Sequence, residues 1–149
     1  MTKARTTLLP LSEALLRYVE RRTIAAADAR KHLGVNELDA RALRHVGDEP
    51  GIRPSRLREH LGITAAGVTT LADRLIGRGL LRREQDADDR RVNHLYLEVD
   101  LDAAPWSSLS VFDNALDREL RSRRADADGA LAALLDAASD AAASATVPS

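Results

Sequence analysis

The sequence predicts a mainly α-helical protein with a single small β-hairpin, and two stretches of the chain lead to this prediction. Residues 53–80 hold two apolar repeats with helical spacing, separated by a glycine and a threonine that suit a sharp turn between helices. Residues 81–97 hold two short strand-like segments around a charged loop that has no apolar side chain larger than alanine. The rest of the chain shows helical spacing only.

Two helices are expected before residue 53. In the first, apolar residues recur at spacings of three and four, at Leu8, Leu11, Leu15, Leu16 and Val19. Asn36 is a good N-cap for the second helix, whose apolar positions are Leu38, Ala42, Leu43 and Val46. We therefore divide the chain into an N-terminal helical segment (1–35), a central domain (36–98) and a C-terminal helical segment (99–149).

A tightly joined pair of helices follows. Pro54 fits the first helical position because its missing N–H would have no partner there. Gly62 can adopt the left-handed conformation that ends a helix, and Thr64 can cap the next one. The apolar side of that next helix consists of Val68, Leu71, Ala72 and Leu75. Its other side carries small and polar residues, namely Ala66, Thr69, Thr70, Asp73 and Arg74.

The hairpin comes next, and we call residues 81–97 the wing. Its loop combines acidic residues with Arg90 and Arg91. A carboxylate can orient a guanidinium group, so that the arginine side chain is already positioned when it reaches a narrow minor groove of DNA. Helix, turn, helix and hairpin in this order form a winged helix-turn-helix, which places one helix in the major groove of DNA and the wing beside it. The predicted DNA-binding residues are Thr64, Ala66, Thr69, Thr70, Arg74, Asp89, Arg90 and Arg91.

Over its central domain the chain resembles the multiple-antibiotic-resistance regulator (MarR) family of bacterial transcription factors. Members of that family carry an Asp-x-Arg element in the wing, and here it falls on Asp89, Arg90 and Arg91. The resemblance implies that Arg91 enters the minor groove, that Asp89 holds it, and that Arg90 contacts a phosphate. The family commonly has an arginine where this chain has Thr70. Sequence specificity therefore does not carry over, and Arg74 is expected to take more of the phosphate contact.

Helical spacing returns after the wing, with Asp102 to Pro105 starting a helix and Leu109, Phe112, Leu116 and Leu120 forming its stripe. Terminal apolar stripes have nothing in a winged helix to cover them. The resemblance implies a homodimer in which the first and last helices of two subunits interlock; the alternative is that they fold back over the same chain. The expected dimerisation residues are Leu8, Leu11, Leu15, Leu131, Leu134 and Leu135.

Three aromatic residues lie on helices that wall a small-molecule cleft in this family. They are Tyr18, Trp106 and Phe112, for which the ordinary role is packing and the alternative is contact with a small-molecule effector.

Charge is divided unevenly along the chain. The formal net charge is −1, but residues 51–97 carry +3 and residues 98–149 carry −6. Phosphate would attract the first of these segments and repel the second. The winged helix is therefore expected to face DNA, and the acidic C-terminal third is expected to lie away from it.

Other functions find little support. The chain has no cysteine, which excludes disulfides and thiol sensing. Its four histidines lack metal-ligand spacing, and arginines adjoin the acidic cluster of the wing, so no metal or other cofactor is expected. Ser107 and Ser110 have no nucleophile motif around them, which argues against an enzyme. No signal peptide or membrane span is recognisable, which predicts a cytoplasmic protein with no membrane partner.

The sequence thus predicts a homodimeric, sequence-specific transcriptional regulator, acting as a repressor on a pseudo-palindromic operator in double-stranded DNA and released by a small ligand. The alternative is a winged helix that binds another protein, such as an antirepressor that does not bind DNA. Tandem arginines in the wing favour the regulator.

Overall fold

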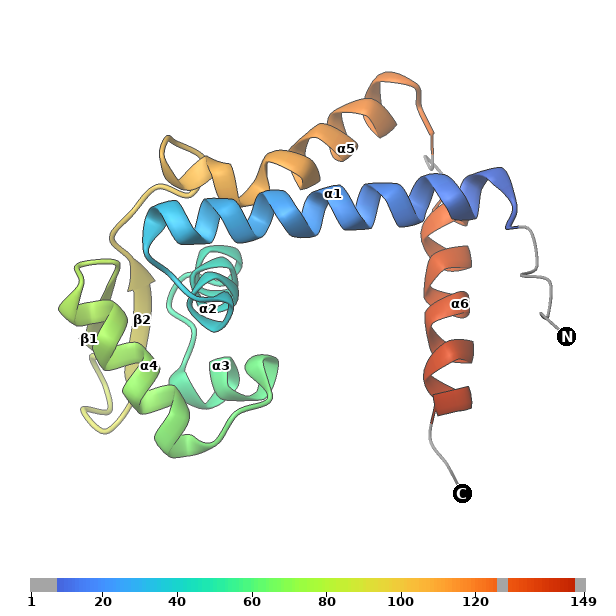
Figure 1. The fold of residues 1–149 in the computed structure, drawn as a ribbon. Coiled ribbons are helices and arrows are strands. Elements are labelled where there is room, and N and C mark those ends of the chain that lie inside the picture. The colour runs from blue at the N-terminus through green and yellow to red at the C-terminus, as the bar shows by residue number, and fades with distance from the viewer. Residues whose placement is uncertain (1–7, 126–128, 147–149) are drawn as a thin grey trace, which may run out of the picture. The chain divides into compact units, whose positions relative to one another are not determined.

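The computed structural model describes residues 8–125 and 129–146, so the first seven and last three residues of the expected terminal segments lie outside it. Its elements are α1 (Pro10–Leu33), α2 (Glu37–Asp48), α3 (Pro54–Leu61), α4 (Ala65–Gly77), β1 (Leu81–Gln85), β2 (Asn93–Leu97), the short 3-10 helix η1 (Trp106–Ser110), α5 (Val111–Ser122) and α6 (Ala130–Thr146) (Figure 1). The predicted mainly α-helical class with one hairpin is confirmed. The chain forms two compact units, one up to Ser110 and one from Val111 onward.

Helices α2, α3 and α4 begin where the sequence predicts. The Asn36 side chain accepts a hydrogen bond from the backbone N–H of Asp39 at 2.8 Å, and the Asp39 carboxylate accepts one from the backbone N–H of Asn36 at 3.2 Å. This reciprocal pair satisfies two backbone donors at the start of α2. Pro54 occupies the first turn of α3, as predicted.

The first helix starts later than its apolar spacing suggests. α1 begins at Pro10, and Leu9 before it has an extended backbone (φ −67°, ψ 150°). A residue before proline is pushed out of the helical region by the proline ring. Leu8, expected on the first turns of the helix, therefore lies ahead of it.

The helix after the wing also starts later than expected. Residues 101–105 form turns, and α5 begins only after η1. The backbone N–H of Asp102 donates to the Asp100 carboxylate at 2.9 Å. Such a local side-chain bond offers the backbone an alternative to a helix. The prediction that residues 102–105 restart the helix is therefore wrong.

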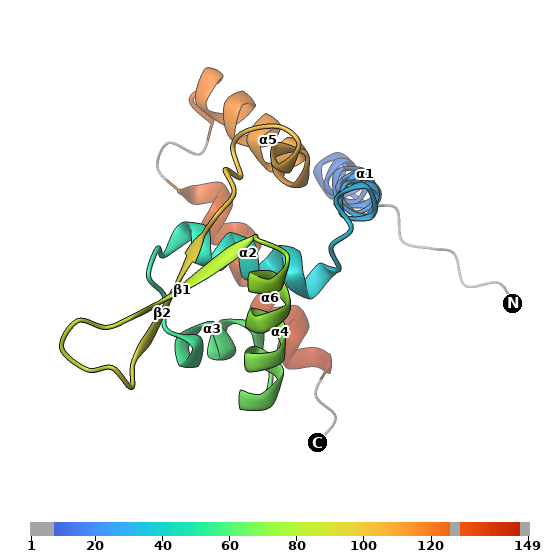
Figure 2. The ribbon, with the colours of Figure 1, turned by 90° about the vertical axis from the view of Figure 1, so that its left-hand side faces the viewer.

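The wing is an antiparallel hairpin in which Leu81 pairs with Leu97 and Arg83 with Leu95. Figure 2 shows its loop extending away from the helices of the first unit. Leu95 also forms a β-bridge with Ile52, in the link between α2 and α3. The base of the wing is thereby hydrogen-bonded to the helical part of the domain.

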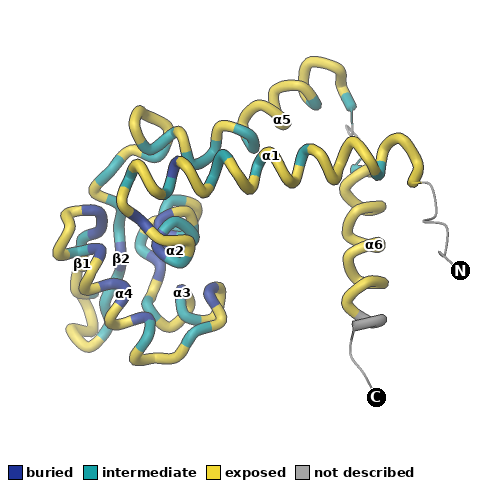
Figure 3. The backbone as a smooth tube through the Cα atoms, in the orientation of Figure 1, coloured by how far each residue is buried: buried dark blue, intermediate teal, exposed yellow. Residues whose placement is uncertain are grey.

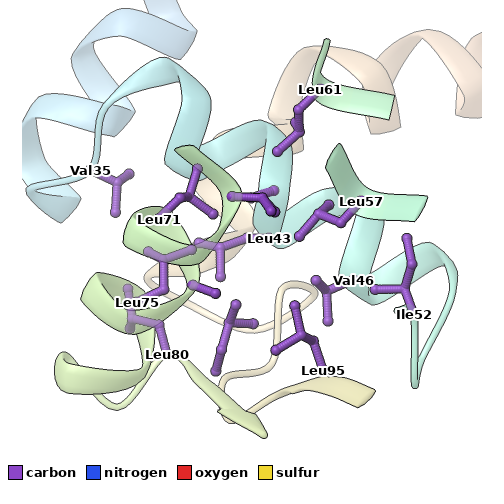
Figure 4. Packing of buried hydrophobic residues seen from close by; sticks show 14 residues of the cluster. Val35, Leu43, Val46, Ile52, Leu57, Leu61, Leu71, Leu75, Leu80 and Leu95 are labelled. Atoms are coloured by element: carbon purple, nitrogen blue, oxygen red, sulfur yellow. The ribbon is translucent and has the colours of Figure 1, made fainter. Parts of the chain in front are cut away.

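The hydrophobic core of the first unit lies between α2, α3, α4 and the wing (Figure 4). Its largest fully buried side chains come from all of these elements: Leu43, Val46, Ile52, Leu57, Leu71, Leu75, Leu81 and Leu95. Burying such a side chain stabilises a fold by about 1.5–3 kcal/mol. The predicted core side of α4 is buried, and this fixes which side of α4 faces solvent.

Exposed leucines mark the terminal helices. Ala29 is the one buried residue of α1, and no described residue of α5 or α6 is buried (Figure 3). Leu11 is 61% exposed and Leu134 is 57% exposed. Among the described residues, no helix combines the length and the apolar character needed to cross a membrane.

Candidate nucleic-acid interface

The turn between α3 and α4 is built from the residues the sequence singles out. Gly62 has a left-handed backbone (φ 66°), and its N–H donates to the carbonyls of Arg58 and Glu59. The hydroxyl of Thr64 accepts from the backbone N–H of Gly67 at 3.0 Å. A Cβ on Gly67 would stand 3.1 Å from that hydroxyl, so the glycine leaves room for the cap. Thr64 thus fixes the start of the helix that would enter DNA.

Small polar residues cover the solvent side of α4. Ala66, Thr69 and Thr70 are all exposed, in the first half of the helix. The hydroxyl of Thr69 donates to the backbone carbonyl of Ala65 at 3.0 Å, one turn earlier. Its oxygen can still accept a hydrogen bond. The first half of α4 therefore presents small side chains to solvent, and their contact with DNA stays a prediction.

Arg74 has a structural partner that sequence reasoning missed. Its Nη2 forms an ion pair with Oδ1 of Asp39, and Asp39 is only 2% exposed. The same carboxylate closes the capping box of α2. An arginine carries five N–H donors, so Arg74 keeps donors for a phosphate while one end is bound to Asp39. An acidic residue three positions after Asn36 was the available sequence signal for the box, but nothing in the sequence links it to Arg74.

A second arginine joins the end of α4 to the end of α1. Arg78 donates from Nη1 to the carbonyl of Gly34 at 2.7 Å and from Nη2 to the carbonyl of Leu33 at 3.1 Å. The last carbonyls of a helix lack partners within the helix, and a cation there also complements the helix dipole. Arg74 and Arg78 together brace the second half of α4 against the junction of α1 and α2.

Side-chain hydrogen bonds to the backbone fix the loop of the wing. Oδ1 of Asp86 accepts from the backbone N–H groups of Asp88 and Asp89, at 2.9 and 3.2 Å. Oδ1 of Asp89 accepts from the backbone N–H of Arg91 at 3.0 Å. Asp89 therefore contacts the main chain of Arg91, whereas the sequence suggested contact with its guanidinium group. The two acidic residues orient the loop that carries Arg90 and Arg91.

The arginines of the wing differ in what they contact. Arg83 binds Asp73 of α4 at 2.7 Å, and Arg82 binds Glu84 and Glu98, each at 3.0 Å. The guanidinium group of Arg82 also lies 4.5 Å from the centre of the Tyr96 ring. Arg90 and Arg91 are exposed, and within the described residues neither forms an ion pair. The loop thus presents two positive charges to solvent.

His94 links the wing to the helical domain. Its Nδ1 lies 2.7 Å from the carbonyl oxygen of Gly51, and its Nε2 lies 2.9 Å from Oδ2 of Asp86. The hydrogen bond to Gly51, followed by that to Asp86, raises the pKa of His94 above 6.5. The bond from His94, followed by the backbone N–H groups of Asp88 and Asp89, lowers the pKa of Asp86 to about 2.

Two other histidines stack. The rings of His45 and His60 lie 4.8 Å apart and are nearly parallel, at 11°. Burial, then the neighbouring His60 and Arg44, lower the pKa of His45, against an opposing effect of Asp48. No three metal-ligating side chains come together in the part of the chain that the structure describes.

The lowered pKa of His45 makes the fold sensitive to acid. Because the folded pKa of His45 lies below 6.5, its contribution to stability is present above pH 6.5 and is lost as the pH falls toward the folded pKa. A His45→Gln variant should therefore lose less stability than the wild type between pH 7.5 and 5.5, measured by urea unfolding. His32→Gln, at an exposed site on α1, is the control and should behave as wild type. Equal losses in His45→Gln and wild type would contradict this.

The three candidate ligand contacts lie in different places. Tyr18 belongs to α1 and is partly exposed. Trp106 belongs to η1 and packs against the core of the winged helix. Phe112 lies on α5, in the second unit. Binding of a small molecule by these residues stays a prediction.

The fold is shared with proteins of known structure, among them a transcriptional regulator. A mutant of MepR from S. aureus bound to an oligodeoxyribonucleotide matches 87% of this chain and 99% of its own, with a TM-score of 0.60 and 15% identity. The transcriptional regulator Tm0710 from Thermotoga maritima matches 89% of this chain and 93% of its own, with a TM-score of 0.60 and 19% identity. Wild-type MarR from E. coli, in its apo form, matches 89% of this chain and 98% of its own, with a TM-score of 0.57 and 20% identity.

The sequence itself carries a family signature. No curated protein matches the chain. Residues 33–92 match the model of the MarR family, a stretch that runs from the end of α1 through the loop of the wing. Members of that family are transcriptional regulators and not enzymes, in agreement with the sequence prediction. Over its winged helix-turn-helix the chain is thus similar to the MarR family, and it shares its fold with MarR from E. coli.

Proposed function

We propose that the chain is a sequence-specific, DNA-binding transcriptional regulator that acts as a homodimer. The observation that carries this proposal is the pairing of α4, whose exposed first half holds small polar residues, with a wing whose loop holds Arg90 and Arg91. α4 would lie in the major groove, and Arg91 would enter the adjacent minor groove. The fold of MepR, whose structure contains an oligodeoxyribonucleotide, supports the proposal.

A homodimer would place two such interfaces on one face of the duplex. Two-fold symmetry calls for a pseudo-palindromic operator whose half-sites lie about 10 base pairs apart, centre to centre. We propose that the regulator is a repressor and that a small ligand lowers its affinity for the operator. Such a ligand would act by favouring a dimer whose helix spacing no longer matches the grooves.

The alternative is a winged helix that binds another protein, such as an antirepressor without affinity for DNA. The two exposed arginines of the wing disfavour it, since a protein-binding wing has no need of both. A gel-shift experiment on duplex DNA from the promoter next to the chain's own gene, repeated at several salt concentrations, separates the two. Binding that weakens steeply with salt supports the regulator. Absence of any shift at low salt favours the alternative.

Arg91→Ala should weaken operator binding by about 1–3 kcal/mol, because it removes a guanidinium group from the minor groove. Asp89→Ala should cost somewhat less, because it releases only the main-chain N–H of Arg91. Fluorescence anisotropy with a labelled operator measures both. Circular dichroism should show that both variants remain folded.

Arg90→Ala is the matched control for Arg91→Ala. As a phosphate contact, Arg90 should contribute to binding of any duplex alike, and its removal should reduce the slope of log K against log salt by about one. Arg91→Ala should instead reduce the preference for operator over unrelated DNA. Unchanged operator affinity in Arg91→Ala would refute the assignment of the wing.

A further inference from the structure

We propose that His94, in its protonated form, is a positioning residue that holds the wing in its DNA-binding arrangement, so that operator affinity falls as the pH rises. This inference rests on the proposed function. The observation behind it is that the imidazole ring lies between two hydrogen-bond acceptors, the Gly51 carbonyl and the Asp86 carboxylate.

Both contacts of His94 require a proton on the ring nitrogen. A carbonyl oxygen can only accept a hydrogen bond, and an ionised carboxylate can only accept as well. The pKa of Asp86 is about 2, so its carboxylate is ionised near neutral pH. A neutral imidazole has one N–H and can serve one of these acceptors, whereas the imidazolium ion serves both. Loss of the proton therefore turns one of the two contacts from attractive to repulsive.

The contacts of His94 continue to the tip of the wing. Oδ2 of Asp86 contacts His94, while Oδ1 of the same carboxylate accepts from the backbone N–H groups of Asp88 and Asp89. Asp89 in turn accepts from the backbone N–H of Arg91. We call these groups, from Gly51 through His94 and Asp86 to Arg91, the wing relay. A change at His94 reaches the backbone of Arg91 through two carboxylates.

The other end of the relay is fixed to the core. The backbone N–H of Gly51 donates to the carbonyl of Leu95 at 2.9 Å, and the backbone N–H of Leu95 donates to the carbonyl of Ile52 at 3.0 Å. Leu95 and Ile52 are buried in the hydrophobic core. The Gly51 carbonyl is therefore a stationary acceptor, and the wing loop is the part free to move when the relay opens.

Charged neighbours of His94 come from three segments. Asp86, in the wing loop, favours the imidazolium ion, while Arg53, in the link between α2 and α3, opposes it. Glu84 is its cross-strand partner on β1 and forms an ion pair with Arg82. The balance raises the pKa of His94 above 6.5. The relay is thus complete below pH 6.5 and is lost as the pH rises through the folded pKa of His94.

The test combines an NMR titration with a binding titration. The ring protons of His94 and the backbone amides of Asp88, Asp89 and Arg91 are followed from pH 5.5 to 8.5 in the free protein. We expect His94 to titrate above pH 6.5 and the three amides to shift with the same midpoint. Operator binding, measured at constant ionic strength over the same range, should weaken around that midpoint by at most tenfold per pH unit.

Variants assign the pH dependence to the relay. In His94→Gln, operator affinity should lose its pH dependence in this range, because an amide does not titrate there. Asp86→Asn should move the midpoint to lower pH. His32→Gln, on α1, is the control and should keep the wild-type profile.

Three results would overturn the inference. His94 could titrate at or below pH 6.5, the amide signals of the wing loop could fail to shift as His94 titrates, or His94→Gln could keep the wild-type pH profile of operator binding. If the wild type binds no duplex at any pH, the proposed function fails, and the amide titration alone decides whether His94 positions the wing.

Discussion

A variant in which Leu134 and Leu135 are both replaced by aspartate is expected to lose the dimer and, with it, most of its operator affinity. The two side chains are 57% and 45% exposed on α6, a helix with no buried residue in its described part. In proteins most of the stability of a helix comes from packing its apolar side against other elements. Leu134 and Leu135 therefore need a partner surface, which the proposed homodimer supplies. Two carboxylates in that apolar seam would cost several kcal/mol.

Sedimentation velocity at micromolar protein concentration measures the oligomeric state, and anisotropy measures binding to the operator. Affinity should fall steeply although no residue of the winged helix has been changed, because one half-site provides about half of the contacts. Ala133→Asp, on the opposite side of α6, is the matched control and should remain a dimer. A wild-type monomer, or a double mutant that stays dimeric and binds normally, would contradict the proposed role of the terminal helices.

Leu75→Ala should reduce the free energy of unfolding by about 2–5 kcal/mol, because it leaves a cavity in a core that cannot fully collapse around it. Leu75 is completely buried on the inner side of α4. The loss is large beside the roughly 5–15 kcal/mol that holds a typical domain together. Urea unfolding at fixed protein concentration measures it.

Thr70→Ala is the matched control on the same helix. Thr70 is exposed on the opposite side of α4, so its truncation should change stability by no more than about 0.5 kcal/mol. A comparison of the two variants distinguishes the buried side of α4 from its exposed side by the free energy of unfolding alone. A small loss in Leu75→Ala, or a large one in Thr70→Ala, would mean that α4 is oriented differently from the structure.

Local signals allowed much of the fold to be predicted from the sequence. Asn36, Gly62 and Thr64 are capping residues whose partners lie within four positions along the chain. The buried side of α4 follows from its apolar spacing alone. Such features depend on neighbours in the sequence, so a single chain is enough to reveal them. Leu8 was misplaced because apolar spacing was followed across Pro10, which sets the actual start of α1.

The contacts that position the candidate interface could not be predicted in the same way. Arg74 reaches Asp39 across 35 positions, and Arg78 reaches Gly34 across 44. His94 reaches Gly51 across 43. Polar residues at partly exposed sites follow no periodic pattern, and any carboxylate or carbonyl in the fold could serve as their partner. Only the packing of the helices brings these groups together.

The brace formed by Arg78 has a mechanical consequence. α1 contains 24 residues, which corresponds to a rod about 36 Å long at ~1.5 Å per residue. The carbonyls of Leu33 and Gly34, at the end of this rod, accept hydrogen bonds from Arg78 at the end of α4, so a tilt of α1 would be transmitted to α4. A displacement of about 3 Å at the far end of such a rod corresponds to a tilt of roughly 5° at the brace. In the proposed complex with DNA, a modest shift at the N-terminal end of α1 would thereby change the angle at which α4 meets a groove.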